Sequence, residues 1–176
     1  MADSDILAIQ QSLNLYGVAV DTQRWDLFDR LFTPDVDADY GATSHWTSLA
    51  RFKTDFAAFH DPFDSTQHTL SSHLVQVDGD RATSFCNGSW RLVRKAVDGA
   101  PLWDGTGWYE DDWMRANGYW RITRRTCRIT WWTGDPLVQE TIPGVKFALR
   151  TTVLRREAEA GRCRILDALA SSRRES

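Results

Sequence analysis

The chain has few cysteines and no long apolar run, and each shortage excludes a class of protein. Its three cysteines, Cys86, Cys127 and Cys163, lie far apart in a chain of 176 residues. This spacing fits neither a zinc site nor a disulfide framework, so we expect reduced thiols and a cytoplasmic location. No apolar stretch approaches the roughly 18–20 residues that span a bilayer. We therefore expect no membrane association. The N-terminal Met-Ala-Asp-Ser-Asp lacks the features of a secretion signal, so we expect no secretion.

Net charge is also small, at −3 from 21 basic and 24 acidic residues. Binding to nucleic acid requires a concentrated positive face. The basic stretch with interleaved aromatics runs from Arg121 to Trp132, and its charges fit a solvated face of a strand better than a phosphate-binding patch. The sequence therefore predicts no nucleic-acid partner.

Aromatic residues, in contrast, are abundant: nine Trp, eight Phe and four Tyr. Packing in a core or an interface is one interpretation, because aromatic side chains bury large areas. A pocket lined for a flat apolar ligand is the other.

The length predicts one domain, and its first third has a helical pattern. One apolar face recurs at spacings of three and four residues, which predicts a helix that begins near Asp3 or Ser4 as N-cap and ends before Asp21-Thr22. Its members are Ile6, Ile9, Leu13, Tyr16 and Val20. Shorter helices are predicted over residues 25–32 and 49–59, the latter capped by Thr47 or Ser48 and closed before Pro62.

The centre of the chain predicts strands. After a brief extended piece at 36–40, runs at 67–77, 81–95, 106–114 and 119–132 are separated by turns at 78–80, 98–99 and 116–118. Helices followed by such a meander predict an α+β fold, with the helices on one face of the sheet. Residues 144–170 are expected to form a helical tail, broken near Gly161, that covers the sheet or a neighbouring subunit.

Several motifs, in order, carry a family resemblance. They are Tyr16-Gly-Val-Ala-Val-Asp21, Trp25-Asp-Leu-Phe, Leu31-Phe32-Thr-Pro-Asp35-Val, Gln67-His68-Thr-Leu-Ser, Val77-Asp-Gly-Asp80-Arg-Ala and Tyr119-Trp120-Arg-Ile-Thr-Arg-Arg125. From residue 5 to about 135 the chain resembles the SnoaL-like, or polyketide cyclase-like, family of the nuclear transport factor-like (ketosteroid isomerase-like) superfamily. The nearest members in motif are dehydratases and dehydrochlorinases with an Asp–His dyad.

The resemblance implies a cone-shaped α+β domain over residues 1–135. A strongly bent, mixed or antiparallel sheet packs against N-terminal helices around an internal apolar cavity, and residues 136–176 form a separate tail. The family includes scytalone dehydratase, hexachlorocyclohexane dehydrochlorinase, steroid isomerases and polyketide cyclases. We accordingly expect a small apolar or aromatic substrate and no metal or other cofactor. A homodimer or homotrimer is expected because an apolar sheet face and the tail need cover.

The same resemblance assigns catalytic roles. Asp21 matches the acid of the dyad and His68 its base, while Arg125 matches an arginine that meets the leaving group in dehydrochlorinase-like members. Tyr16 stands where dehydratase-like members carry a tyrosine, which favours loss of an oxygen-linked group. Histidine suits a general base at neutral pH, and a carboxylate on its other ring nitrogen sets the tautomer and stabilises the imidazolium.

Each of these residues also has a structural interpretation. A lone strand histidine is usually structural, and Asp21 could simply end its helix, although an acid there opposes the helix dipole. Arg128 competes with Arg125 for the pocket, because a bulge near Thr126-Cys127 would exchange the strand's faces.

The remaining histidines and the substrate contacts complete the predicted site. His45 and His60 are interpreted as surface groups, with His45 a candidate for a lid, and His73 as packing or exposed. The residues expected to contact substrate are Trp108, Trp131, Trp90, Phe56 and Asn87.

The predicted function is a cofactor-independent lyase of the dehydratase type. An isomerase or cyclase could use the same base. The sequence is also compatible with a non-catalytic small subunit of a ring-hydroxylating dioxygenase and with a plain ligand-binding protein.

Overall fold

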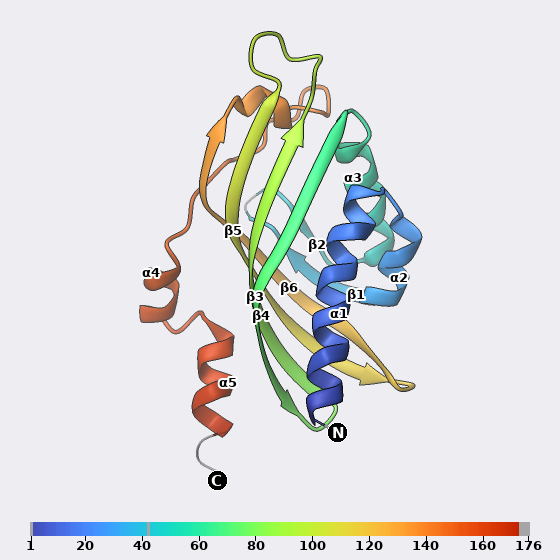
Figure 1. Cartoon of the computed structure of the whole chain (residues 1–176), viewed down its shortest axis with the longest axis vertical. Helices are drawn as coiled ribbons and strands as arrows, with labels where there is room; N and C mark the ends of the chain where they lie inside the picture. The colour runs from blue at the N-terminus through green and yellow to red at the C-terminus, as the bar shows by residue number, and fades with distance from the viewer. Residues whose placement is uncertain (1, 42, 173–176) are drawn as a thin grey trace.

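Six strands form one curled, unclosed sheet in the computed structural model, which describes residues 2–41 and 43–172 (Figure 1). The strands are β1 (Phe32–Asp39), β2 (His45–Trp46), β3 (Ser65–Asp78), β4 (Arg81–Val93), β5 (Leu102–Ala116) and β6 (Tyr119–Gly134). Their order is β2-β1-β6-β5-β4-β3, with β1 and β6 parallel and the other neighbours antiparallel. The predicted α+β fold with a bent mixed sheet is confirmed.

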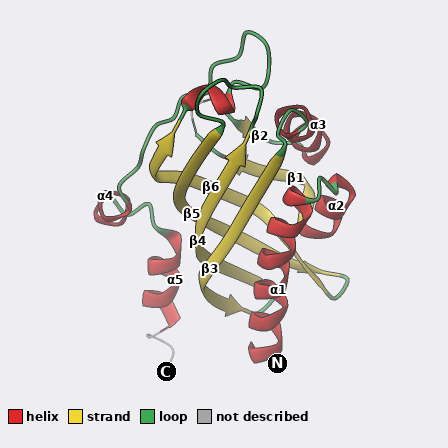
Figure 2. Cartoon of the chain, turned by 45° about the horizontal axis from the view of Figure 1, so that its top comes forward, coloured by secondary structure: helices red, strands yellow, loops and turns green. Residues whose placement is uncertain are grey.

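The N-terminal helices lie on the concave side of this sheet, here called the inner face (Figures 1 and 2). They are α1 (Ala2–Asp21), the short η1 (Trp25–Leu27) with α2 (Phe28–Leu31), and α3 (Leu49–His60). The predicted helices are present, but α1 starts before the expected caps, so Asp3 and Ser4 lie inside its first turn. Ser48 occupies the N-cap position of α3 without a side-chain hydrogen bond to it.

Helix α1 packs closely on β3. Of its apolar face, Ile9, Leu13, Tyr16 and Val20 are fully buried and Ile6 partly. Gly17 permits the close approach, because a Cβ atom there would lie 2.9 Å from the backbone oxygen of His68. This contact brings the C-terminal end of α1 beside the start of β3.

The C-terminal segment crosses to the opposite, outer face of the sheet. After η2 (Pro136–Gln139), residues 140–153 are irregular, and α4 (Leu154–Glu159) and α5 (Arg164–Ser172) follow (Figure 2). The prediction of helix from residue 144 is wrong for residues 144–153, where apolar side chains instead line a cavity. The boundary at residue 135 between cone and tail stays a prediction.

Bulges in two strands change which side chains face inward. In β6, Ile122 pairs with Trp113 and Arg124 with Asp112, which leaves Thr123 as an extra residue. In β3, the register shifts between Ser71 and Leu74, and Ser72 has a φ of +56°. Since side chains alternate along a strand, each extra residue moves all later ones to the other face.

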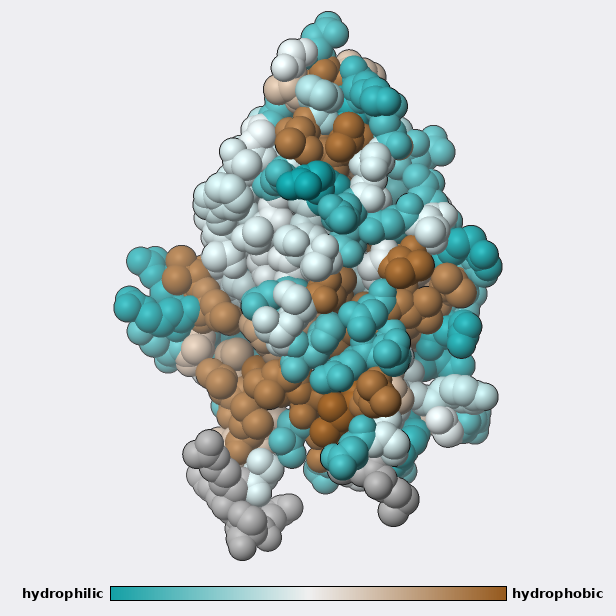
Figure 3. Space-filling view, in the orientation of Figure 1, coloured by the Kyte–Doolittle hydropathy of each residue, from teal (hydrophilic) through white to brown (hydrophobic). Residues whose placement is uncertain are grey.

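Apolar side chains also reach the surface. Figure 3 views the molecule from the same side as Figure 1. Hydrophobic residues, in brown, gather in its lower part, where Figure 1 places α5 and the start of α1. Leu7 of α1 and Leu166 of α5 are 56% and 48% exposed. Exposed apolar patches often mark interaction surfaces. The homodimer or homotrimer stays a prediction.

Candidate active site

A cavity of about 630 Å³ lies inside the cone and is mostly apolar. The inner face of the sheet forms one wall, α1 and α3 contribute others, and the segment at 139–149 lies across it. Its lining includes Tyr16, Tyr40, Phe56, His60, His68, Trp90, Trp103, Tyr109, Phe147 and Leu149. A pocket of this size and character suits a small ring-bearing ligand.

Asp21 and His68 meet at this cavity. The Nδ1 atom of His68 lies 2.7 Å from Oδ1 of Asp21, and the backbone N–H of His68 donates to Oδ2 at 2.8 Å. The hydroxyl of Thr66 donates to Oδ1 at 2.8 Å. The carboxylate therefore accepts hydrogen bonds that hold the imidazole in one orientation.

These contacts decide the charge on Asp21. Burial alone would raise the pKa of Asp21, but the hydrogen bonds from His68 and Thr66 outweigh burial and lower that pKa below its ordinary value. An ionised carboxylate on Nδ1 keeps the proton on that nitrogen and leaves the lone pair on Nε2. Nε2 of His68 has no hydrogen-bond partner among the described residues and is not sealed in the protein, although the side chain is only 6% exposed.

Tyr16 lies deeper in the same cavity and is paired with a residue that the sequence analysis missed. The hydroxyls of Tyr16 and Tyr40 are 2.9 Å apart. Burial raises the pKa of Tyr16 to about 12 and that of Tyr40 well above its usual value. Both phenols therefore stay protonated. One O–H is used in the hydrogen bond between them, and the other remains available as a donor. Tyr40 follows directly after β1, where only its aromatic character could have drawn attention.

Arg125 faces inward but does not line the cavity. It is completely buried, and its Nε and Nη2 atoms each lie 2.7 Å from a carboxylate oxygen of Asp111. Its guanidinium carbon lies 4.2 Å from the ring centroid of Tyr16 and 4.7 Å from that of Tyr109. Burial opposes the charge of Arg125, but Asp111 outweighs it and holds the pKa of the guanidinium well above its usual value.

The rival, Arg128, lies on the outer face and binds the carboxylate of Asp39. The bulge that brings Arg125 inward is at Thr123. The register is continuous at Thr126-Cys127, where a bulge would have exchanged the faces in favour of Arg128. The structure therefore places Arg125 beneath the tyrosine pair, where it has no direct access to the cavity. Its predicted contact with a leaving group would have to be indirect, through Tyr16.

The residues expected to contact substrate divide between the faces. Trp90 and Phe56 line the cavity, whereas Trp108, Asn87 and Trp131 do not. Asn87 and Trp108 are paired directly across β4 and β5, so they share the outer face. Trp131 follows a second bulge in β6 and is 54% exposed.

Among the other histidines, the prediction is wrong for His60 alone. His60 is not a surface group: it is 2% exposed and lines the cavity. It lies four residues after Phe56, on the apolar stripe of α3, and this spacing could have revealed its burial. His45 is largely exposed at the cavity's edge, with Nε2 2.6 Å from Asp37. His73 is half-buried, and burial lowers its pKa.

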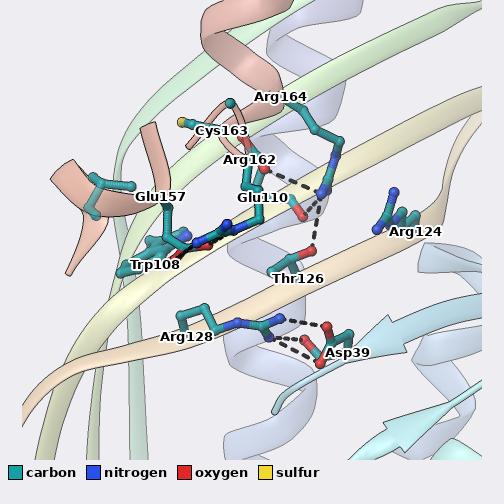
Figure 4. Close-up of a pocket in the computed structure, with 12 residues that line it drawn as sticks. Asp39, Trp108, Glu110, Arg124, Thr126, Arg128, Glu157, Arg162, Cys163 and Arg164 are labelled. Carbon is teal, nitrogen blue, oxygen red and sulfur yellow. Dashed lines mark hydrogen bonds and ion pairs between the residues drawn. The ribbon is translucent and has the colours of Figure 1, made fainter. Parts of the chain in front are cut away.

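A second hollow, of about 280 Å³, lies between the outer face and the linker from α4 to α5. Figure 4 shows its charged side chains turned toward one another. Arg164 bonds to Asp112, Thr126 and the backbone oxygen of Glu110, and Arg162 bonds to Glu157. Glu110 also accepts a hydrogen bond from the backbone N–H of Ile165 at 2.9 Å. The side chains that line this hollow therefore anchor α5 to the sheet.

Within residues 2–41 and 43–172, no cluster of His, Cys, Asp and Glu side chains has the arrangement of a metal site. None of the helices described there is long and apolar enough to cross a membrane. The cytoplasmic location stays a prediction.

Comparison with known families identifies the domain. Residues 3–126 match the SnoaL-like domain. The chain belongs to the SnoaL-like family. An uncharacterised protein of Mycobacterium tuberculosis (strain H37Rv) is 37% identical to this SnoaL-like protein over 123 residues, which cover 69% of this chain and 83% of that relative.

Solved structures share the fold. A Kribbella flavida protein superposes with a TM-score of 0.71 at 22% identity, covering 76% of this chain and 95% of that one. A candidate scytalone dehydratase from Novosphingobium aromaticivorans has a TM-score of 0.69 at 20% identity, covering 86% and 95%. A type 2 hexachlorocyclohexane dehydrochlorinase has a TM-score of 0.66 at 14% identity, covering 82% and 93%. At these identities the likeness establishes the cone fold alone.

Proposed function

We propose that this SnoaL-like protein is a cofactor-independent lyase that eliminates water, or another oxygen-linked group, from a small apolar ring-bearing substrate. The observation that carries the proposal is the Asp21–His68 pair, joined at 2.7 Å at the wall of an apolar cavity. Of the two ring nitrogens of His68, Nε2 is the one left to accept a proton, because Nδ1 is engaged by the carboxylate.

The chemical step begins with the base. Nε2 of His68 takes a proton from a carbon next to an activating carbonyl or ring, and Asp21 stabilises the imidazolium that forms. The electrons of the C–H bond form the new double bond while the neighbouring C–O bond breaks. The departing oxygen takes a proton directly from the imidazolium, or from the tyrosine pair, which the imidazolium then reprotonates. The products are the alkene and water, and the protein returns to its starting state.

The Tyr16–Tyr40 pair supports elimination of oxygen in particular. The pair lines the cavity and stays protonated. One O–H is used in the hydrogen bond between the two hydroxyls, so the other is left to donate to an oxygen that gains negative charge. A donor well aimed at developing charge contributes about 3–4 kcal/mol to the transition state. Arg125, buried below Tyr16, adds a positive field that acts on these phenols.

The substrate class follows from the lining. Phe56, Trp90 and Trp103 present aromatic surface, and the cavity volume of about 630 Å³ limits the ligand to a small molecule. The candidate scytalone dehydratase and the dehydrochlorinase that share the fold are named for eliminations, which agrees with this proposal.

An isomerase or cyclase would use the same base without a leaving group, and the tyrosine pair could then donate to an enolate oxygen. The mass of the product separates these reactions from elimination. A β subunit of a candidate ring-hydroxylating dioxygenase also shares the fold, with a TM-score of 0.62 at 18% identity. A scaffold of that kind needs neither a paired Asp–His nor an open cavity. Co-purification with a large iron–sulfur subunit would favour the scaffold.

The test is a screen of ring-bearing alcohols with product analysis by mass spectrometry. We expect a product lighter than its substrate by one water, and a fall of roughly 10²–10⁴ in kcat/KM for His68→Gln or Asp21→Asn. His45→Gln is the matched control, since His45 is an exposed histidine at the cavity's edge. A product of unchanged mass would indicate an isomerase or cyclase. Full activity in folded His68→Gln would exclude His68 as the general base.

A further inference from the structure

The cavity holds a second histidine that the proposed elimination does not use. His60, the last residue of α3, is 2% exposed, and its ring centroid lies 6.0 Å from that of His68. Aromatic rings surround it: Trp25 at 5.3 Å, Phe56 at 4.8 Å and Phe59 at 5.0 Å between centroids. A polar ring is thus built into an otherwise aromatic wall next to the dyad.

The hydrogen bonds of His60 determine which nitrogen carries the proton. Nδ1 lies 2.7 Å from the backbone oxygen of Phe56, and a carbonyl oxygen can only accept, so Nδ1–H is the donor. Burial, reinforced by nearby His68, lowers the pKa of His60 to about 3. At neutral pH the ring is therefore uncharged, and Nε2 carries a lone pair.

That lone pair is available to a ligand. Nε2 of His60 has no hydrogen-bond partner among the described residues. It nevertheless keeps some accessible surface, so it is not sealed inside the protein. Because His60 is almost fully buried and lines the cavity, the accessible surface of Nε2 opens on that cavity. Leaving a buried acceptor unpaired costs free energy, which a donor on the ligand would recover.

We propose that His60 is a specificity-determining residue, whose Nε2 accepts a hydrogen bond from a hydroxyl group of a ring-bearing ligand bound beside His68. The inference rests on the proposed function in placing the substrate in this cavity. It narrows the substrate class from ring-bearing compounds in general to compounds whose ring itself carries a hydroxyl group. The short separation of the imidazoles suits a ligand whose hydroxyl and acidic C–H belong to the same ring.

The competing interpretation is that His60 serves only to tie α3 together and fill space. Two substitutions separate these roles. In His60→Asn the side-chain NH₂ can still donate to the oxygen of Phe56, but the acceptor at the position of Nε2 is lost. In His60→Gln the longer amide can place its oxygen near the position of Nε2. A purely structural role would favour Asn over Gln, whereas the proposed acceptor role favours Gln over Asn.

The experiment measures binding of 1-naphthol, 2-naphthol and naphthalene by equilibrium dialysis at pH 7. We expect at least one naphthol to bind the wild-type protein about tenfold more tightly than naphthalene, as one buried hydrogen bond allows. His60→Asn should reduce that ratio to within twofold, and His60→Gln should retain most of it. Equal binding of all three compounds to the wild type, no detectable binding of either naphthol, or an unchanged ratio in His60→Asn would overturn the proposal.

A second readout identifies the atom. In ¹⁵N NMR of the imidazoles, Nε2 of His60 should have the shift of an unprotonated nitrogen, and naphthol should move it toward that of a hydrogen-bonded one. Tyr16→Phe and His68→Gln are controls that should keep the preference for naphthol. If the preference vanishes in either control instead, the hydroxyl binds there and His60 is not its acceptor. Because binding needs no turnover, this result is separate from the elimination test.

Discussion

The two faces of the sheet use ionisable side chains in opposite ways. On the outer face, Arg164 forms ion pairs with both Glu110 and Asp112, and Glu110 also accepts from the backbone N–H of Ile165. These contacts, of which Figure 4 shows Arg164 beside Glu110, attach α5 to the sheet. On the inner face, Asp21 engages one nitrogen of His68 and leaves the other accessible from the cavity. A mutually satisfied cluster stabilises structure, whereas a cluster with one atom left open can act on a ligand.

The inner face also contains a pair that is as closed as those outside. Arg125 and Asp111 are 0% and 1% exposed at their side chains and share two hydrogen bonds. The difference between reactive and structural groups is therefore not burial alone. It lies in whether the lone pair or proton left over after pairing has access to the cavity.

The largest expected effect on stability tests that closed pair. Asp111→Asn leaves the buried guanidinium of Arg125 without its counter-charge, so we expect the free energy of unfolding to fall by about 3–5 kcal/mol. Urea denaturation followed by tryptophan fluorescence measures it. The double variant Asp111→Leu with Arg125→Met should lose less than Asp111→Asn, because no charge is left unpaired. A loss below about 1 kcal/mol in Asp111→Asn would show that the charge finds another partner.

An intermediate effect should come from pH, through His60. Its pKa is lowered to about 3, so between about pH 6.5 and 3 the unfolded chain binds more protons at this residue than the folded chain. The free energy of unfolding should therefore fall with falling pH, by up to about 1.4 kcal/mol per pH unit. Urea denaturation from pH 7 to 4.5 measures this slope.

Two variants assign the slope to its source. His60→Asn should remove most of it, and His73→Gln a smaller part, because burial lowers the pKa of His73 as well. Asp21 does not interfere in this range: its pKa is lowered, so the stability it contributes is lost only at more acidic pH. The same slope in His60→Asn as in wild type would mean that His60 is not the titrating group.

The smallest effect is expected on the outer face. Arg164→Met removes hydrogen bonds to Asp112 and Glu110 at a partly exposed site, so we expect a loss of about 1–2 kcal/mol in the free energy of unfolding. Binding of 2-naphthol in the cavity should change less than twofold. A large change in binding would break the comparison, because it would couple the outer cluster to the inner site.

Strand periodicity predicted the strands well and their faces poorly. The runs at 67–77 and 119–132 became β3 and β6, but the bulges at Ser72 and Thr123 reversed the faces beyond them. Strict alternation along one strand would place Arg125 on the face opposite Ile122, but both face inward and are fully buried. A bulge depends on how two strands fit together, which is not encoded in the alternation of one strand.

The sequence alone determined the helical first third, the long strands, their turns and the family. It also singled out Asp21, His68 and Tyr16, because those residues stand in short motifs with local spacing. Only the tertiary structure decided that Tyr40 joins Tyr16, that His60 is buried beside His68, and that Arg125 is occupied by Asp111. These contacts join segments far apart in the chain, so their distances depend on strand register, bulges and the packing of α1 and α3 on the sheet.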